Sequence, residues 1–572
     1  MARQRIVRQQ QAGAIAWRLS RRRLVRMAGG GSAALAAAAI GCDSSGKRPA
    51  PSGAGAARQP RKGGIISYAG GQVGSWDTQA RSFDPMIQTQ SGARSYTLFY
   101  ERLLAYNLVT YEVEPELAQK WEQPSPTELL FRLQPGVRWQ NKPPLNGRLM
   151  TTDDVLWSFQ RAQTDDPKFY SRSLLTNVDK LEAPDSSTIK ITTKAADAST
   201  LNKISTDNLA ILSREVFEKD PKPTTADASV GTGAFLMKSV EENVGAEYVR
   251  NPDYWRANRP YLDGFRTRAL PDNQSAWSAY LAGQIDVTLL DGPAAKTYVS
   301  QQGPGYSPAW GADDTIGAFM YPNTKVKPMD DLRVTRALRL LTDHDEWINT
   351  WALDLFGRGD HGSVFPPVLP AWDLTHDEYR SHLEWKQPKD EAAKEAISLL
   401  SAAGFSKDKP LKFTMIAGTG QQGQSETQLT QAQWKRLSLG AVDVDIKLLA
   451  QAEIDTARAG RSFTYGIFGH SAGPADPEIW LSTTYRSGGS LNFMGLSDPR
   501  LDAMIDKQRT IFDERQRKEA VKAIVSYMID NSPSTIGANR YFLHATQPKV
   551  QGYQPETHYL NGRLFSSVWL SG

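Results

Sequence analysis

From Gly63 onwards the chain alternates between short runs that predict β-strands and longer amphipathic runs that predict α-helices. The strand-like runs cover residues 64–69, 187–193, 411–417, 442–449 and 464–468. The helical runs begin near Thr152, at Asp331 and at about Lys389, and two more fill 498–530. The alternation has no fixed repeat period. It therefore predicts an α/β protein with insertions and argues against a solenoid or a barrel.

Helix ends are marked by capping residues. Thr152 is the expected N-cap of the first clear helix, because two acidic residues follow it in the first turn. Asp331 is the expected N-cap of the second. The helix that begins near Lys389 should stop at Gly404, which suits the left-handed position after a helix.

The first 62 residues predict an export signal and a tether. Residues 20–26, with three consecutive arginines, have the pattern of a twin-arginine signal, and the apolar run up to Gly41 is too short to span a bilayer. Residues 1–41 are therefore expected to be a twin-arginine lipoprotein signal peptide. Residues 42–62 lack apolar periodicity and are expected to form a flexible linker.

Cys42 is the only cysteine in the sequence and directly follows the export signal, at the end of a lipobox-like Ala-Ile-Gly-Cys. This position predicts that Cys42 carries the lipid that anchors the protein to the membrane. A single cysteine also excludes a disulfide within the chain, so the folded part must be stabilised by its core.

The net charge of +5 is carried by the N-terminal region. Residues 1–41 contain eight arginines and no acidic residue, and the linker adds further basic residues, so the folded part is net negative. A mildly acidic surface does not favour nucleic acid as a partner, because that would require clustered Lys and Arg.

Gly469-His470-Ser471-Ala472-Gly473 fits Gly-x-Ser-x-Gly, the nucleophile elbow of α/β-hydrolases. His544 and His558 lie downstream, so a chain order Ser…Asp…His is available. Pro474 and Pro477 argue against it, because they delay the helix that should follow the elbow directly. A secreted serine hydrolase that uses Ser471 is thus the alternative hypothesis.

Other motifs do not support a cofactor or a metal. Gly231-Thr232-Gly233 lacks the Lys-Ser/Thr ending of a phosphate-binding loop and predicts a tight turn. The seven histidines are scattered, without the spacing of a metal site. We expect neither a cofactor nor a metal ion.

Several segments together carry a resemblance to one family. PELAQKWEQPSPTELLFRLQPGVRWQNKPPLNGRLMTTDDVLWSFQRA (115–162) and GTGAFLMKSVEENVGAEYVRNPDYWRANRPYLDGF (231–265) resemble signature blocks of the peptide/nickel-type (family 5) extracellular solute-binding proteins. Further matching segments follow in family order at 279–287, 330–348, 399–405 and 475–495. Collinear agreement over most of 63–572 is stronger than any single motif.

The resemblance implies an α/β, two-lobed periplasmic-binding-protein fold (class II) with an extra subdomain, in which hinge motion encloses a ligand between the lobes. The expected division is lobe I from 63–107, 229–305 and 535–572, the extra subdomain from 108–228, and lobe II from 306–534.

The implied function is binding, not catalysis. The protein would capture a small solute, such as an oligopeptide or a saccharide, and deliver it to the permease and ATPase subunits of an ABC importer. It would be an exported monomer, held by its lipid on the periplasmic or cell-surface face of the cytoplasmic membrane, with no nucleic-acid partner.

Residues expected to face the ligand come from the segment after the first strand and from the loop 468–494. They are Trp76, Phe83, Phe468, His470, Ser471, Tyr485 and Asn492.

In peptide-binding relatives, an Asp three residues before the acidic residue of an Asp/Glu-Pro pair neutralises the peptide's ammonium group. Here the pair is Asp476-Pro477, and the position three before it is Gly473. Asp476 is instead expected to be an N-cap with Pro477 at the first helical position.

Overall fold

The computed structural model describes most of the chain from Gln59 onwards. The described residues are 59–70, 82–87, 94–107, 112–166, 169, 171–241, 244–270, 272–290, 292–301, 310–312, 316–352, 364–366, 369–470, 476–536, 541–554 and 562–571. The predicted signal peptide, Cys42 and the linker up to Arg58 therefore lie outside them. None of the helices in the described part of the chain is both long and apolar enough to span a membrane.

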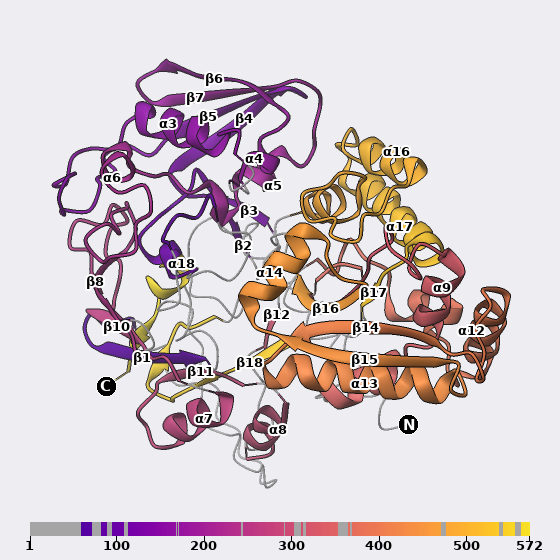
Figure 1. Cartoon of the computed structure of the whole chain (residues 1–572). Helices are drawn as coiled ribbons and strands as arrows, with labels where there is room; N and C mark the ends of the chain where they lie inside the picture. Colours follow the sequence, from indigo (N-terminus) through magenta and orange to yellow (C-terminus); the bar gives the residue numbers. More distant parts are fainter. Residues whose placement is uncertain are drawn as a thin grey trace, which may run out of the picture. The chain divides into compact units, whose positions relative to one another are not determined.

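The first sheet is assembled from distant parts of the sequence (Figure 1). Its central strand β1 pairs in parallel with β10 and β11, and the other pairings are antiparallel. Ile66 and Tyr68 of β1 are fully buried. Its strands, in spatial order, are β12 (Trp310–Ala312), β18 (Tyr541–Thr546), β11 (Val287–Leu290), β1 (Ile65–Gly70), β10 (Gly264–Thr267), β9 (Gly245–Arg250) and β8 (Phe235–Glu241).

The second sheet is mixed. β14 pairs in parallel with β15 and β16, whereas β13 is antiparallel to β16 and β17. Met415 of β14, Leu338 and Trp434 are buried together in its core. The spatial order is β15 (Val442–Leu449), β14 (Leu411–Gly418), β16 (Tyr465–His470), β13 (Ile316–Pro322) and β17 (Thr535–Ile536).

The third sheet lies within the expected extra subdomain and is antiparallel throughout. Phe131, Ile189 and Ile191 point into a core that also contains Val155 and Phe159 of α3. The order is β4 (Ala118–Ser125), β5 (Glu128–Leu133), β7 (Thr188–Thr193) and β6 (Val178–Asp185). Two short antiparallel pairs are β2 (Leu104–Asn107) with β3 (Glu112–Pro115), and β19 (Val550–Gln551) with β20 (Trp569–Leu570).

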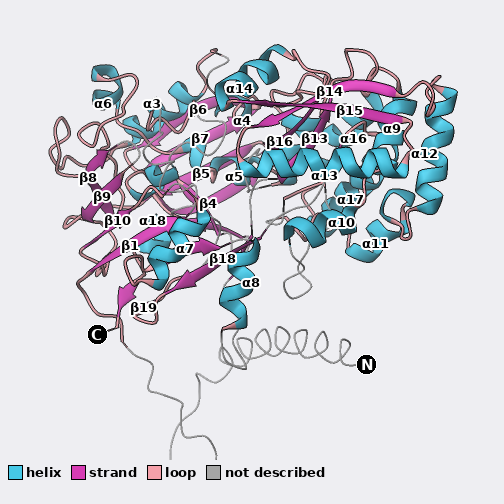
Figure 2. Cartoon of the chain, turned by 60° about the horizontal axis from the view of Figure 1, so that its bottom comes forward, coloured by secondary structure: helices cyan, strands magenta, loops and turns pink. Residues whose placement is uncertain are grey.

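Helices connect and cover the strands (Figure 2). In chain order they are α3 (Thr152–Ala162), α4 (Ser171–Leu174), α5 (Thr200–Ile204), α6 (Arg214–Lys219), α7 (Asn273–Leu281), α8 (Gly292–Ser300), α9 (Leu332–Leu340), α10 (His344–Trp347), α11 (His376–Ser381), α12 (Asp390–Ala402), α13 (Gln421–Leu437), α14 (Gln451–Gly460), α15 (Pro477–Trp480), α16 (Pro499–Gln508), α17 (Glu514–Asn531) and α18 (Gly562–Phe565).

The predicted helix ends are confirmed with one correction. Asp331 caps α9, its carboxylate accepting from the Arg333 amide, and Gly404 takes φ +89° just beyond α12. Thr152, however, is already helical, and the N-cap is Thr151. Thr151 has extended backbone angles and donates its amide to the Asp154 carboxylate at 2.8 Å, which makes it the residue before the first helical turn.

Strand pairing bears on the expected lobe boundaries at two points. β12, at Trp310–Ala312, pairs with β18 in the first sheet, although 306–534 was expected to be lobe II. β17, at Thr535–Ile536, pairs with β13 in the second sheet, although 535–572 was expected to be lobe I. The division into two lobes and an extra subdomain stays a prediction.

Gly231-Thr232-Gly233 lies against the backbone of Leu98 and Phe99. A Cβ on Gly231 would come within 1.7 Å of the Phe99 carbonyl oxygen, and the Gly233 amide donates to that oxygen at 2.9 Å. Close backbone approach therefore explains these glycines.

Candidate functional site

Two of the expected ligand-facing residues belong to one aromatic cluster on the second sheet. Phe468 of β16 has its ring centroid 5.4 Å from that of Tyr321 on the neighbouring strand β13. Tyr485 lies 6.0 Å from Phe319, which itself contacts Tyr321 at 4.4 Å. Phe493 adds an edge-on contact to Tyr321 at 6.1 Å. We call Phe319, Tyr321, Phe468, Tyr485 and Phe493 the aromatic cluster.

Burial raises the pKa of both tyrosines in the aromatic cluster. For Tyr321 the nearby Arg458 charge acts in the opposite direction, and for Tyr485 the charge of Tyr321 adds to the effect of burial. Both phenols are therefore neutral. Four of the five rings are at most 6% exposed and belong to the large hydrophobic core. Neutral, buried aromatic side chains suit packing and not acid–base chemistry.

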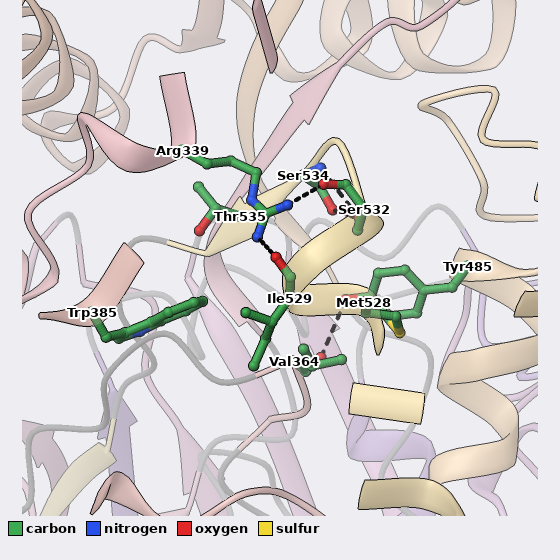
Figure 3. A pocket seen from close by; sticks show the side chains of 9 residues that line it. All are labelled: Arg339, Val364, Trp385, Tyr485, Met528, Ile529, Ser532, Ser534 and Thr535. Carbon is green, nitrogen blue, oxygen red and sulfur yellow. Dashed lines mark hydrogen bonds between the residues drawn. The ribbon is translucent and has the colours of Figure 1, made fainter. Parts of the chain in front are cut away.

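Tyr485 also borders a small cavity (Figure 3). Its hydroxyl donates to the Val364 carbonyl at 3.2 Å. The cavity measures about 20 Å³, which is space for one water molecule. It is too small for the solute itself. It is lined by Arg339, Val364, Trp385, Tyr485, Met528, Ile529, Ser532, Ser534 and Thr535.

Asn492 uses its amide to shape the loop that carries Phe493. Its Nδ2 donates to the carbonyls of Arg486 and Leu496, at 3.1 and 2.8 Å, and its Oδ1 accepts from the Leu496 amide at 3.0 Å. These bonds give the Asn492 side chain a positioning role.

Asp476 lies at the start of α15, as predicted. Its backbone is extended, its carboxylate accepts from the Glu478 amide at 2.8 Å, and Pro477 occupies the first helical position. The same carboxylate receives two hydrogen bonds from Arg517 of α17 and one from Asn202 of α5. The N-cap prediction is confirmed.

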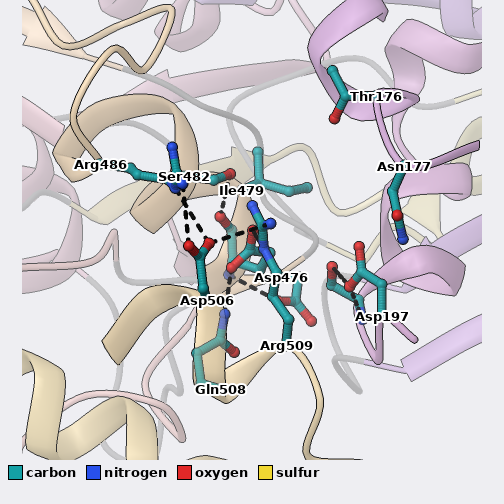
Figure 4. Close-up of polar contacts among 12 residues, drawn as sticks. Thr176, Asn177, Asp197, Asp476, Ile479, Ser482, Arg486, Asp506, Gln508 and Arg509 are labelled. Carbon is teal, nitrogen blue, oxygen red and sulfur yellow. Dashed lines mark hydrogen bonds and ion pairs between the residues drawn. The ribbon is translucent and has the colours of Figure 1, made fainter. Parts of the chain in front are cut away.

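Glu478 is the second buried carboxylate of this region. It accepts hydrogen bonds from Gln508 and, at 2.5 Å, from Arg509. Lys203 lies 3.9 Å away. Burial raises the pKa of Glu478, although the charges of Lys203 and Arg509 counteract it. In Figure 4, Asp506 lies between Arg486 and Arg509 and extends the chain of polar contacts.

These contacts join α5 of the expected extra subdomain to α15, α16 and α17 of expected lobe II. The Ala198 amide donates to the Arg509 carbonyl at 2.8 Å, and Asp197 binds Lys203 at 2.8 Å. We call Asp197, Asn202, Lys203, Asp476, Glu478, Gln508, Arg509 and Arg517 the buried polar network. It includes Asp476, the first described residue after β16.

The other expected site residues are distributed differently. Phe83 is buried against Phe99, with ring centroids 5.9 Å apart, in the large core cluster. His470 ends β16, but its side chain is outside the described part of the structure. Trp76 and Ser471 lie outside the described residues altogether. The ligand-facing role of all seven residues stays a prediction.

The comparison with protein families decides the class of protein. Residues 112–492 match the family model described as "Bacterial extracellular solute-binding proteins, family 5 Middle".

The chain belongs to this family.

Curated relatives of this family 5 protein align over most of their length. Heme-binding protein A of Haemophilus influenzae is 25% identical over 502 residues, covering 82% of this chain and 86% of the relative. The dipeptide-binding protein of Pseudomonas aeruginosa is 25% identical over 512 residues, covering 82% and 90%.

Solved structures agree on the fold of the family 5 protein. The ABC transporter-associated periplasmic binding protein DppA of Helicobacter pylori, solved in complex with peptide STSA, superimposes with a TM-score of 0.73. It is 22% identical, and the match covers 90% of this chain and 99% of that one. The expected α/β, two-lobed periplasmic-binding-protein fold is confirmed.

The hydrolase alternative gains no support from these findings. The family consists of solute-binding proteins. His544 lies on β18 of the first sheet, where its Nδ1 is 2.7 Å from the Tyr553 hydroxyl. The Gly469–Gly473 motif, in contrast, begins with the last two residues of β16 in the second sheet. Among the described residues no cluster of His, Cys, Asp and Glu could hold a metal ion.

Sequence reasoning missed several residues of this region. Tyr321 and Phe493 complete the aromatic cluster, and Arg517 binds Asp476 from 41 positions further along the chain. The aromatic run Phe319-Met320-Tyr321 signalled a strand with large side chains. No local pattern signalled the pairing of Arg517 with Asp476.

Proposed function

We propose that this family 5 protein captures a small solute, such as an oligopeptide, a saccharide or a similar compound, and delivers it to the permease and ATPase subunits of an ABC importer. The observation that carries the proposal is the family match over residues 112–492. Related proteins named for dipeptide binding and for ABC transport support the solute class and the partner.

We propose that the protein is exported and acts as a lipid-anchored monomer. The twin-arginine pattern, the apolar run and Cys42 at its end support this. Two or more acyl chains on one terminus give firm anchoring, because each buried methylene contributes about 0.8 kcal/mol to membrane binding. The linker up to Lys62 leaves the folded part free to meet the importer.

The proposed binding surface centres on the aromatic cluster and the loop after β16. Phe468 and Tyr485 lie in that cluster, and His470 and Ser471 follow Phe468 directly in the chain. Trp76, Phe83 and Asn492 complete the proposed set, with Asn492 acting through the shape of its loop. Rigid aromatic side chains bind a solute at low cost in conformational entropy.

We further propose that the ligand is not held by a carboxylate that neutralises a free ammonium group. Asp476 is engaged by Arg517, Asn202 and the Glu478 amide, and Gly473 supplies no charge. An ammonium buried without a counter-charge would weaken binding by several kcal/mol. The proposed binding surface therefore favours solutes that lack a free α-ammonium.

Native mass spectrometry of the mature protein, released from membranes under mild conditions, tests the binding function. We expect an added mass that corresponds to a retained small solute. Uptake of that solute should disappear in cells that lack this gene and return with the wild-type copy. Retention of no solute, together with unchanged uptake of all candidate solutes, would contradict the proposal.

Hydrolysis of a generic ester is the matching test for the alternative. Activity that disappears in Ser471→Ala would favour a hydrolase. We expect no such activity.

A further inference from the structure

Arg458, in the last turn of α14, is a buried arginine beside the aromatic cluster. The residue is only 9% exposed. Its guanidinium carbon lies 4.5 Å from the ring centroid of Phe493 and 5.7 Å from that of Phe468. Its charge also acts on the Tyr321 phenol. Two rings of the aromatic cluster therefore lie against this cation, and its charge reaches the phenol of a third member.

Within the described part of the chain, Arg458 has neither a carboxylate partner nor a hydrogen bond to its buried Nε. Other buried arginines differ. Arg517 binds Asp476, Arg339 binds Glu384 and Arg102 binds Glu116, each through a carboxylate. Among the buried arginines of the described residues, Arg458 therefore differs from the other three in lacking a carboxylate partner.

The aromatic rings alone do not compensate the burial of this cation. A guanidinium over an aromatic face gains about 0.5–2 kcal/mol. Removing an ion from water costs several kcal/mol even after the protein relaxes. Burial of a guanidinium without an anion therefore has a net unfavourable free energy, which pairing with an external anion would offset. The planar guanidinium group matches the geometry of a carboxylate.

We propose that Arg458 binds a carboxylate group of the transported solute. This inference rests on the proposed function, since Phe468 is one of the expected ligand-facing residues. It adds the charge class of the ligand. With Asp476 occupied by Arg517, and with no carboxylate beside Arg458 among the described residues, the site favours a solute that carries a carboxylate and no free ammonium.

The first test needs no ligand. Arg458→Met keeps the apolar stem beside the rings and removes the charge. In protein stripped of solute by unfolding in guanidinium and refolding, we expect its melting temperature to equal or exceed that of the wild type. Arg517→Met, which leaves Asp476 unpaired, should lower it. A lowered melting temperature in Arg458→Met would overturn the inference, because the guanidinium would then be a structural group.

The second test compares matched pairs of solutes by calorimetry. The probes are an N-acetylated tripeptide and its C-terminal amide, and an oligosaccharide ending in a uronic acid and its methyl ester. At least one acid should bind at least about tenfold more tightly than its neutral partner, as expected for one charge-assisted pair. The preference should vanish in Arg458→Met.

The matched control is Arg500→Met. Arg500 also lies over an aromatic ring, that of Tyr527 at 4.9 Å, but it is exposed on α16. Its loss should leave the preference for the acid unchanged. Equal binding of acid and neutral partner to the wild type, or a preference that persists in Arg458→Met, would overturn the inference.

The native mass measurement separates this inference from the proposed function. A retained solute without a carboxylate would refute the role of Arg458 and leave the binding function intact. A retained solute with a carboxylate that is lost in Arg458→Met would support both. If no solute is retained and no probe binds, the proposed function fails, and the inference fails with it.

Discussion

Arg517 of α17 binds both carboxylate oxygens of Asp476, with Nη1 and Oδ2 2.8 Å apart. The two side chains are 5% and 0% exposed. The carboxylate also caps α15 and accepts from Asn202. One aspartate thus connects α5, α15 and α17, and its charge is compensated within the protein.

Loss of this carboxylate should destabilise the fold strongly. Asp476→Ala removes a cap and leaves a buried cation unpaired, so we expect the free energy of unfolding to fall by about 3–5 kcal/mol. Asp331→Ala is the matched control, because Asp331 also caps a helix and binds an arginine, but at the surface. It should cost about 1 kcal/mol. Urea unfolding measures the free energy of unfolding of both variants. Equal losses of stability in the two variants would contradict the structural role of the buried polar network.

Blocking the amino terminus of a peptide should not weaken its binding. Asp476 is engaged and Gly473 has no side chain, so no identified acid meets an α-ammonium. Calorimetry with di- to pentapeptides, free and N-acetylated, measures this. Sub-micromolar binding of free peptides that acetylation abolishes would point to an acid elsewhere in the cleft.

Glu101 should make stability fall as pH rises towards neutrality. Burial and the charge of Glu116 raise its pKa to about 7, and Thr232, Tyr254 and Trp255 donate hydrogen bonds to it. Because the pKa of Glu101 is higher in the folded state, the contribution of its bound proton to stability is complete below the unfolded pKa. This contribution is lost as pH rises through 7.

Glu101→Gln should remove this dependence. Between pH 4.5 and pH 8 the wild type should lose about 3 kcal/mol more stability than the variant. Glu247→Gln, at a half-exposed site on β9, is the control and should behave as the wild type. Parallel pH profiles for wild type and Glu101→Gln would exclude Glu101 as the titrating group.

Glu384 should act in the opposite direction. Burial disfavours its charge, but Arg339, His344 and Thr535 prevail and lower its pKa to about 2. Its contribution to stability is therefore complete above its unfolded pKa and is lost as pH falls through 2.

Glu384→Gln should cost about 3–5 kcal/mol at neutral pH, because Arg339 stays buried. The difference from the wild type should shrink in acid. Glu395→Gln breaks the half-exposed pair with Arg336 and should cost at most about 1 kcal/mol. A loss at Glu384 that stays constant down to pH 2 would contradict the assignment.

Intact-mass analysis of protein extracted from membranes should find Cys42 at the N-terminus with added acyl mass, because it directly follows the export signal. Cys42→Ser should remain unacylated and leave the membrane fraction. A mature form that retains residues 1–41 would disprove this processing.

The sequence by itself determined the class of protein and many local elements. Strand 442–449, the caps at Asp331 and Asp476, and the helix end at Gly404 could be predicted because each depends on neighbouring residues. The expected N-cap at Thr152 was wrong by only one residue, because Thr151 and Thr152 offer the same capping group.

Only the tertiary structure decided which distant residues meet. β1 pairs with β10 and β11, and Arg517 reaches Asp476. Arg458 lies beside Phe468 and Phe493, without a carboxylate partner in the part of the chain that the structure describes. Periodicity states which face of an element is apolar, but not what packs on it. Whether a buried charge finds a counter-charge depends on contacts between elements far apart in the chain, and that compensation separates a structural arginine such as Arg517 from a proposed ligand-binding one such as Arg458.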